Sequence, residues 1–426
     1  MADPWINQCD ETHPVGSLCP PYGKPKEVPI YAMEEYALRA FFYDYCITPV
    51  NPEVSRGFLA GLESMVHHQG LQSQVAKACK AIAFASHGLK LNRPFLTRKA
   101  EELYHELLTT LAHAIKDPTL INRADAAVMA ILLGLFEMML ADGIDSGNHR
   151  AHAGGLAALL QIENSPLALL AAVSLGWSLL ANGGQVSRLK SGIFSFPCFY
   201  GRGNDLDSLL IRLGSICKES HALSSQTSAQ PDAAKLAALR EDAWALNHDI
   251  SQWQLSQRED SSPITIGHLI PNAADPSPQA GYWPGRVDIY IDFYVAAVWN
   301  ASRLARCLVI NCLIQLSDIL NDDSTTLQTR QDLFRQVEDI IASIPYHFTS
   351  DVRSFLRCAH GESREIASPE RPAAGLLLMH PIYVVSTLPS VAPGMQEYMR
   401  KCLSWIGTHM GIGQASLLGL VGGTLA

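Results

Sequence analysis

The chain has 426 residues, of which 48% are hydrophobic and 17% are charged, so apolar side chains are plentiful enough for a large folded core. Its formal net charge of −9 argues against a DNA-binding or membrane-binding surface, because both ligands require basic residues. Ten cysteines are scattered without a CxxC pair, and no apolar signal sequence opens the chain. We therefore expect reduced thiols in a nuclear or cytoplasmic protein that is not secreted and binds no membrane.

Residues 1–30 are rich in proline and lack apolar periodicity, which predicts an extended or disordered leader. Within it, Cys9-Asp10-Glu11 is followed by Pro14 and Cys19. This pattern resembles the end of the fungal binuclear zinc-cluster DNA-binding domain, in which six cysteines hold two zinc ions. Gly16 stands at a ligand position, and the first two cysteines and the basic run have no room ahead of the motif. A structural zinc ion needs about four ligands, so we expect a truncated, degenerate cluster that Cys9 and Cys19 cannot complete.

Residues 31–426 are predicted to form one large multi-helix, all-α domain. Apolar residues three and four positions apart predict an amphipathic helix over 96–115, with Thr97 as its N-cap. A nearly continuous apolar helix follows from Asp125 to Leu140. It is too short to span a bilayer, as is the apolar stretch 167–181, and both are better explained as core helices. A further helix over 149–161 presents small residues that allow close helix packing.

The segment 215–284 is predicted to be looser than the rest of the domain. It combines a polar helix over 233–253 with a loop over 261–284 that is rich in proline, glycine and serine. Only Ile264–Ile266 in this loop alternates like a strand. Beyond it, apolar periodicity predicts helices over residues 287–319, 327–344, 373–385 and 395–418.

Several blocks, in this order along the chain, are similar to the fungal-specific transcription factor domain, the regulatory domain that follows zinc clusters. They are Ala100–Leu108, His152–Leu160, Tyr290–Arg306, Ile344-Pro345-Tyr346-His347, Leu377–Val384 and Ile406–Ala415. The resemblance implies an all-helical regulatory module. As partners we expect a full-length zinc-cluster regulator or a second copy of the chain, with a small-molecule ligand as a further candidate and no direct nucleic-acid binding.

The helix predicted over 287–319 carries a polar stripe formed by Asp292, Asn300, Arg303 and Arg306. Buried polar groups must be paired or face a cavity, so the stripe predicts either an interhelical salt-bridge network or a ligand pocket. A histidine that titrates near about 6.5 would be a usable proton donor if it lined such a pocket. The candidate polar groups of this pocket are Asp292, Asn300, Arg303, Tyr346, His347, His380 and Tyr383.

Two histidine pairs are weaker candidates for metal binding. His67 and His68 are adjacent and would point about 100° apart on a helix, although Glu63 lies one turn before the first of them. His149 and His152 lie three residues apart, but no third ligand has a suggestive spacing. We therefore expect no metal and no cofactor.

Two classes of function remain open. The first is a transcription-regulator-like protein that is linked to a fungal secondary-metabolite gene cluster and lacks an intact DNA-binding zinc cluster. The second is a metal-independent biosynthetic enzyme of the cyclase, isomerase or pericyclase type, which would need only a shaped apolar pocket with one or two polar groups. We favour the regulator, because the family-like blocks cover most of the chain and no catalytic constellation stands out. Whether the chain is an enzyme stays open on the sequence.

Overall fold

The computed structural model describes residues 30–116, 123–140, 206–224, 233–271, 279–320, 326–359 and 366–421. These residues contain thirteen α-helices, one short 3-10 helix and one two-stranded antiparallel sheet, which confirms the prediction of an all-α fold. Within these ranges no helix combines the length and the apolar character needed to cross a membrane. The cysteine motif at 9–19, the predicted helix over 149–161 with its two histidines, and the apolar stretch 167–181 lie outside the described residues.

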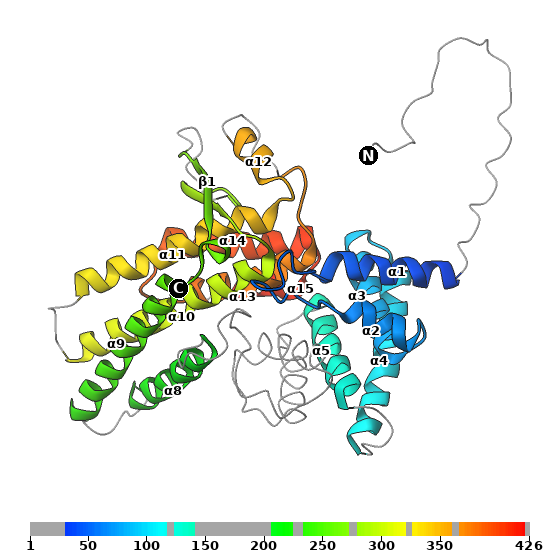
Figure 1. Cartoon of the computed structure of the whole chain (residues 1–426), viewed down its shortest axis with the longest axis horizontal. Coiled ribbons are helices and arrows are strands. Elements are labelled where there is room, and N and C mark those ends of the chain that lie inside the picture. Colours follow the sequence, from blue (N-terminus) through cyan, green and yellow to red (C-terminus); the bar gives the residue numbers. More distant parts are fainter. Residues whose placement is uncertain are drawn as a thin grey trace, which may run out of the picture.

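The helices α1 to α5 lie together at one end of the molecule (Figure 1). They are α1 Ile30–Tyr45, α2 Leu62–Gln69, α3 Gln74–Lys90, α4 Pro94–Lys116 and α5 Arg123–Leu140. The helix α3 contacts α1, α4 and α5, and most of its residues are buried. Its first turn is capped by Ser73, whose hydroxyl accepts a hydrogen bond from the Ala76 amide at 3.3 Å.

The opposite end of the molecule is built around α10, which contacts α8, α9 and α11 (Figure 1). The elements there are α8 Leu206–Ser224, α9 Ala233–Leu255, η3 Glu259–Ser261, β1 Ile264–Leu269, β2 Gly285–Ile289, α10 Phe293–Leu320, α11 Thr326–Phe348 and α12 Val352–Cys358. Strands β1 and β2 form an antiparallel hairpin, and β2 packs on α11. This hairpin sets the position at which the chain enters α10.

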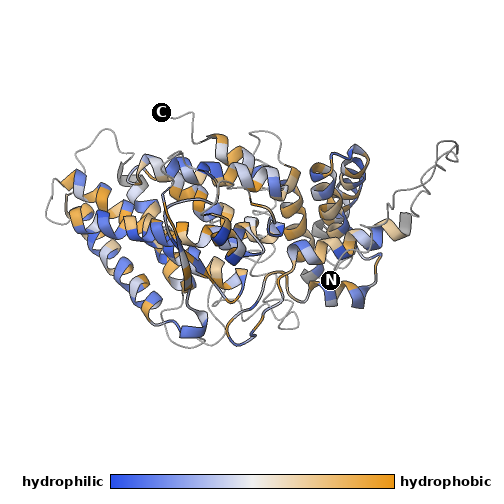
Figure 2. Cartoon of the chain, turned by 90° about the horizontal axis from the view of Figure 1, so that it is seen from above, coloured by the Kyte–Doolittle hydropathy of each residue, from blue (hydrophilic) through white to orange (hydrophobic). Residues whose placement is uncertain are grey.

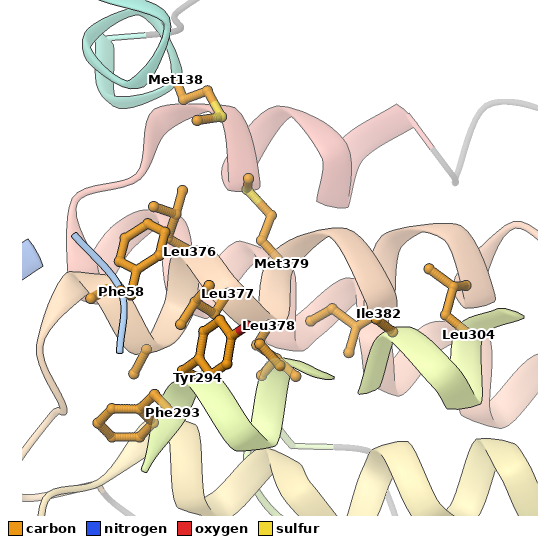
Figure 3. Close-up of a cluster of buried hydrophobic side chains, with 14 of the residues drawn as sticks. Phe58, Met138, Phe293, Tyr294, Leu304, Leu376, Leu377, Leu378, Met379 and Ile382 are labelled. Atoms are coloured by element: carbon orange, nitrogen blue, oxygen red, sulfur yellow. The ribbon is translucent and has the colours of Figure 1, made fainter. Parts of the chain in front are cut away.

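The two ends are joined by α13 Pro372–Ser386, α14 Pro393–Met410 and α15 Gly413–Val421. The helix α13 contacts α1, α10 and α11, while α15 contacts α5, so one large hydrophobic core connects the two ends. A second, smaller cluster formed by Leu269, Tyr282, Val287 and Phe355 lies between the strands and α12. Figure 3 shows Leu377 and Leu378 of α13 beside Tyr294 of α10 in this core. Hydrophobic and hydrophilic bands alternate along most helices in Figure 2, as expected for helices that bury one face.

The helix predicted over 287–319 begins later than expected. Residues 285–289 form β2, in which Val287 is fully buried and pairs with Gly267 of β1. The helix α10 starts at Phe293, and the Asp292 carboxylate caps it by accepting a hydrogen bond from the Val295 amide at 2.9 Å. Part of the loop predicted over 261–284 is therefore strand β1, which extends the alternation seen at Ile264–Ile266.

Two other boundaries also differ from the predicted ones. The single helix expected over 395–418 is two helices, because Gly411 adopts a left-handed conformation with φ of 74° and ends α14. The helix α4 begins at Pro94, a residue that suits a first helical turn because its missing amide has no intrahelical partner there. Thr97 is consequently inside the helix and is not its N-cap.

Candidate functional site

The polar stripe of α10 contributes to a buried hydrogen-bond network. The Arg303 side chain is 2% exposed, and its Nη1 donates to the Tyr290 hydroxyl at 2.6 Å and to Asn300 Oδ1 at 3.0 Å. Asn300 is fully buried and donates through Nδ2 to the Ser343 hydroxyl of α11 at 2.9 Å. The network therefore links α10 to α11 and to Tyr290, the residue that follows β2. Two of the predicted site residues are in direct contact within it.

The charge of Arg303 is not neutralised by a contacting carboxylate. Within the described ranges Arg303 forms no ion pair. Instead, its guanidinium carbon lies 5.5 Å from the ring centroid of Trp299 and 5.8 Å from that of Tyr290. Aromatic faces attract cations and compensate part of the cost of burying one. The network consequently consists of hydrogen bonds and ring contacts rather than the salt bridges that the stripe suggested.

Negative charge is nevertheless close to this network. Arg286 on β2 binds Asp288 at 3.0 Å and Asp339 of α11 at 2.6 Å. Burial raises the pKa of Tyr290, Arg303 lowers it, and the two carboxylates raise it again. The Arg303 guanidinium and the two carboxylates therefore act on Tyr290 with opposite sign, although neither carboxylate pairs directly with Arg303.

Tyr346 and His347, near the end of α11, pack next to this network. The Tyr346 ring centroid lies 5.6 Å from that of Tyr290 and 4.8 Å from that of Phe293. His347 is fully buried, and its Nδ1 lies 2.8 Å from the carbonyl oxygen of Ala374, which can only accept. Burial lowers the pKa of His347 to about 4. The imidazole is thus neutral near pH 7, and the expectation of a proton donor titrating near 6.5 is wrong for this histidine.

Asp292 lies in the same region. The prediction that it shares a helix face with Asn300 is wrong, because Asp292 precedes the first turn of α10. Burial raises the pKa of Asp292, while hydrogen bonding from the Ser55 hydroxyl and from the Val295 amide lowers it. Its carboxylate also raises the pKa of Tyr346. Asp292 therefore joins the start of α10 to the segment that follows α1, and its main local task is helix capping.

The two remaining candidates, His380 and Tyr383, are on α13 and do not join the network. Within the described residues, neither side chain has a hydrogen bond, ion pair or ring contact with Asn300 or Arg303. Burial lowers the pKa of His380, and its Nδ1 has no hydrogen-bond partner among these residues. The structure thus brings together five of the seven candidate groups in one region and leaves two apart.

The rest of the stripe and the histidine pair on α2 have other environments. Arg306 donates to Asn247 at 3.3 Å and to Gln254 at 3.0 Å, so it joins α10 to α9 instead of facing Arg303. His67 and His68 are exposed beside a shallow surface pocket of ≈ 510 Å³ that lies away from the network. Among the described residues, no group of three or more His, Cys, Asp or Glu side chains could hold a metal ion.

Sequence reasoning missed three members of the network: Tyr290, Trp299 and Ser343. The first two were within the predicted helix, but nothing in the local pattern indicated that their rings would face Arg303. Ser343 is 43 residues from Asn300, and no local pattern marks that pairing. The sequence offered one indication of this pairing: Ser343 is a polar residue on the buried face of the amphipathic helix predicted over 327–344.

The buried polar groups of this all-helical domain bind one another, which rigidifies the core. Over 401 residues, which are 94% of each chain, the sequence is 52% identical to transcription factor dbaG of Emericella nidulans. The chain therefore belongs to the family of this fungal transcription factor. No protein-family model matches the chain, and no solved structure matches it.

Proposed function

We propose that this protein regulates transcription of a fungal secondary-metabolite gene cluster from the nucleus. In this proposal it depends on a partner, a full-length zinc-cluster regulator, for sequence-specific contact with DNA. The observation that carries the proposal is the 52% identity to a transcription factor over 94% of both chains. An identity of this extent includes the helical domain, so the domain is the part that the two proteins have in common.

We assign DNA binding to the partner because of the net charge and the cysteine content of this chain. The 426 residues carry a net charge of −9, whereas DNA recognition relies on a basic surface that neutralises phosphates. Cys9 and Cys19 together supply two of the roughly four ligands that a structural zinc ion needs. We infer that the fungal-specific transcription factor domain is the active part and that the cysteine motif is a degenerate cluster.

The enzyme alternative is not favoured. An enzyme of this type would need a pocket lined by polar side chains, such as Arg303 and Tyr346, that are free to form hydrogen bonds with a substrate. Arg303 and Asn300 are instead 2% and 0% exposed and are bonded to each other and to neutral side chains. Together with the relationship to a transcription factor, this packing supports a structural role for the network.

The test is deletion of the gene in its native host, followed by transcript and metabolite profiling. We expect reduced transcripts from one contiguous set of biosynthetic genes and loss of its product. A chain fused to a fluorescent protein should be nuclear and restore both. Unchanged transcripts in the deletion strain would refute the proposal.

A matched variant tests the role assigned to the cysteine motif. Cys9→Ser/Cys19→Ser should complement the deletion as well as the natural chain does, because these thiols hold no zinc cluster. Failure of this variant to complement, at equal protein level, would contradict the degenerate-cluster proposal and leave the regulatory role intact.

A further inference from the structure

The segment between α12 and α13 exposes a serine directly before a short antiparallel bridge. Ser368 is exposed, and its carbonyl oxygen accepts a hydrogen bond from the Ser350 amide at 3.1 Å. The next residue, Pro369, forms an antiparallel bridge with Thr349. These contacts fix the main chain at Ser368, while the residue itself is exposed. A serine in an exposed connecting segment is accessible to other proteins, as the substrate of a protein kinase must be.

The residues that follow give this serine a specific pattern. Ser368-Pro369-Glu370-Arg371 places proline directly after the serine and a basic residue three positions on. The whole sequence contains five serines or threonines followed by proline, namely Thr48, Ser165, Ser262, Ser277 and Ser368. Ser368 alone among them has a basic residue at the third position. Such charge patterns are what kinases use to discriminate between substrates.

We propose that Ser368 is a phosphorylation site for a proline-directed protein kinase of the cyclin-dependent class, and that its phosphate releases Arg371 from α1. The γ-phosphoryl group of ATP is transferred to the Ser368 hydroxyl oxygen, so that a new O–P bond forms. The bond between the γ-phosphorus and the bridging oxygen of ADP breaks, and the serine proton passes to the kinase. The proposal concerns regulation of the chain and does not depend on which genes it regulates.

Arg371, three residues further along the chain, is the cation that we expect a phosphate at Ser368 to bind. It is the N-cap residue of α13, and its Nη1 donates to the carbonyl oxygens of Tyr43 and Cys46, each at 3.2 Å. These carbonyls belong to the C-terminal end of α1, where the last groups of a helix lack intrahelical partners. Arg371 therefore fastens α1 to the start of α13.

A phosphate would compete with these carbonyls for the guanidinium. The Arg371 side chain is 27% exposed, and its nearest carboxylate, Glu370, is 3.8 Å from Nε. Phosphoserine carries close to two negative charges at neutral pH and forms charge-assisted hydrogen bonds with arginine, which are stronger than bonds to neutral carbonyls. Arg353, exposed in the first turn of α12, lies three residues after Ser350 in the sequence and is a second candidate cation. We therefore expect phosphorylation to loosen the end of α1.

The site is tested on the purified full-length chain with a recombinant cyclin-dependent kinase and Mg-ATP. Intact-mass and peptide mass spectrometry should show one phosphoryl group, located on Ser368. Ser368→Ala should lose it, whereas Thr48→Ala and Ser262→Ala should retain it, and Arg371→Leu should slow its addition. Phosphate that maps to another position, or equal incorporation into Ser368→Ala, would overturn the site.

The consequence for α1 is tested by amide hydrogen exchange of the same preparations. Peptides that cover residues 36–46 should exchange faster in the phosphorylated chain than in the unmodified one. Unmodified Arg371→Leu should show the same increase, since it removes the same two hydrogen bonds. Stoichiometric phosphate on Ser368 with unchanged exchange in this region would overturn the release of Arg371 and leave the site standing.

Discussion

The Asn300 side chain is the best place to test what the buried network contributes to stability. Replacement by leucine, of similar size, removes one hydrogen bond to the charged Arg303 and one to the Ser343 hydroxyl. A bond to a charged group contributes about 1.5–3 kcal/mol and a neutral one about 0.5–1.5 kcal/mol. Asn300→Leu should therefore lower the free energy of unfolding by roughly 2–4 kcal/mol, seen as a lower urea midpoint at an unchanged m-value.

Asn300→Asp separates the effect of charge from that of shape. The new carboxylate would lie where Oδ1 now accepts from Arg303 at 3.0 Å, and would give that guanidinium the ion pair that it lacks. We expect less than half the destabilisation of Asn300→Leu at pH 7. Because Arg303 would hold the folded pKa of this carboxyl below its unfolded value of about 3.9, this stabilisation is present above about pH 4. It should be lost as the pH falls through the folded pKa.

Asn311 provides a matched control on the same helix. It is 8% exposed, and its Oδ1 has no hydrogen-bond partner among the described residues, so Asn311→Leu should be neutral or stabilising. Wild-type stability of Asn300→Leu would refute the view that the network holds α10 and α11 together. Equal losses in the leucine and aspartate variants would refute the argument that Arg303 lacks a compensating charge.

Two further predictions concern the packing of the same domain. Because burial holds the pKa of His347 at about 4, below an unfolded value of about 6.5, the domain should lose up to roughly 3 kcal/mol as the pH falls from 6.5 to 4. His347→Phe should flatten this pH dependence in urea unfolding, and an unchanged slope would contradict the assignment. Gly407→Ala should cost about 1–2 kcal/mol, because its methyl group would collide with the Ser416 hydroxyl and come within 2.7 Å of the Ser416 amide nitrogen. At Gly214 an added methyl group would meet nothing within 4 Å, so Gly214→Ala should stabilise by about 1 kcal/mol in the same urea unfolding assay. A loss comparable to that at Gly407 would refute the packing argument.

Local periodicity was sufficient to predict most of the helices. The spacing of apolar residues over 96–115 and 125–140 fixes which face of each helix is buried, and α4 and α5 follow from it within a few residues. The strand β2 was missed for a physical reason. It is five residues long and is stabilised by pairing with β1, whose partner residues lie about twenty positions earlier in the sequence.

The candidate site could be predicted only in part, because its contacts are long-range. The chemistry of Asn300 and Arg303 in an apolar helix correctly indicates that they must be paired. It does not identify Ser343 or Tyr290 as partners, since those contacts depend on how α11 and β2 pack on α10. The low pKa of His347 likewise comes from tertiary burial, to which its sequence neighbours gave no guide.

Arg303 and Arg371 differ in exposure, and this difference separates their roles. Arg303 is 2% exposed, so neither a kinase nor a soluble anion can reach it without unfolding the core. Arg371 is 27% exposed and binds main-chain carbonyls of α1, which are weaker partners than a phosphate. In our proposal the buried Arg303 network keeps the core rigid, whereas the hydrogen bonds between Arg371 and α1 can be replaced by bonds to a phosphate. The Asn300 variants should therefore change stability without altering the exchange of α1, whereas phosphorylation of Ser368 should alter that exchange and leave the urea midpoint nearly unchanged.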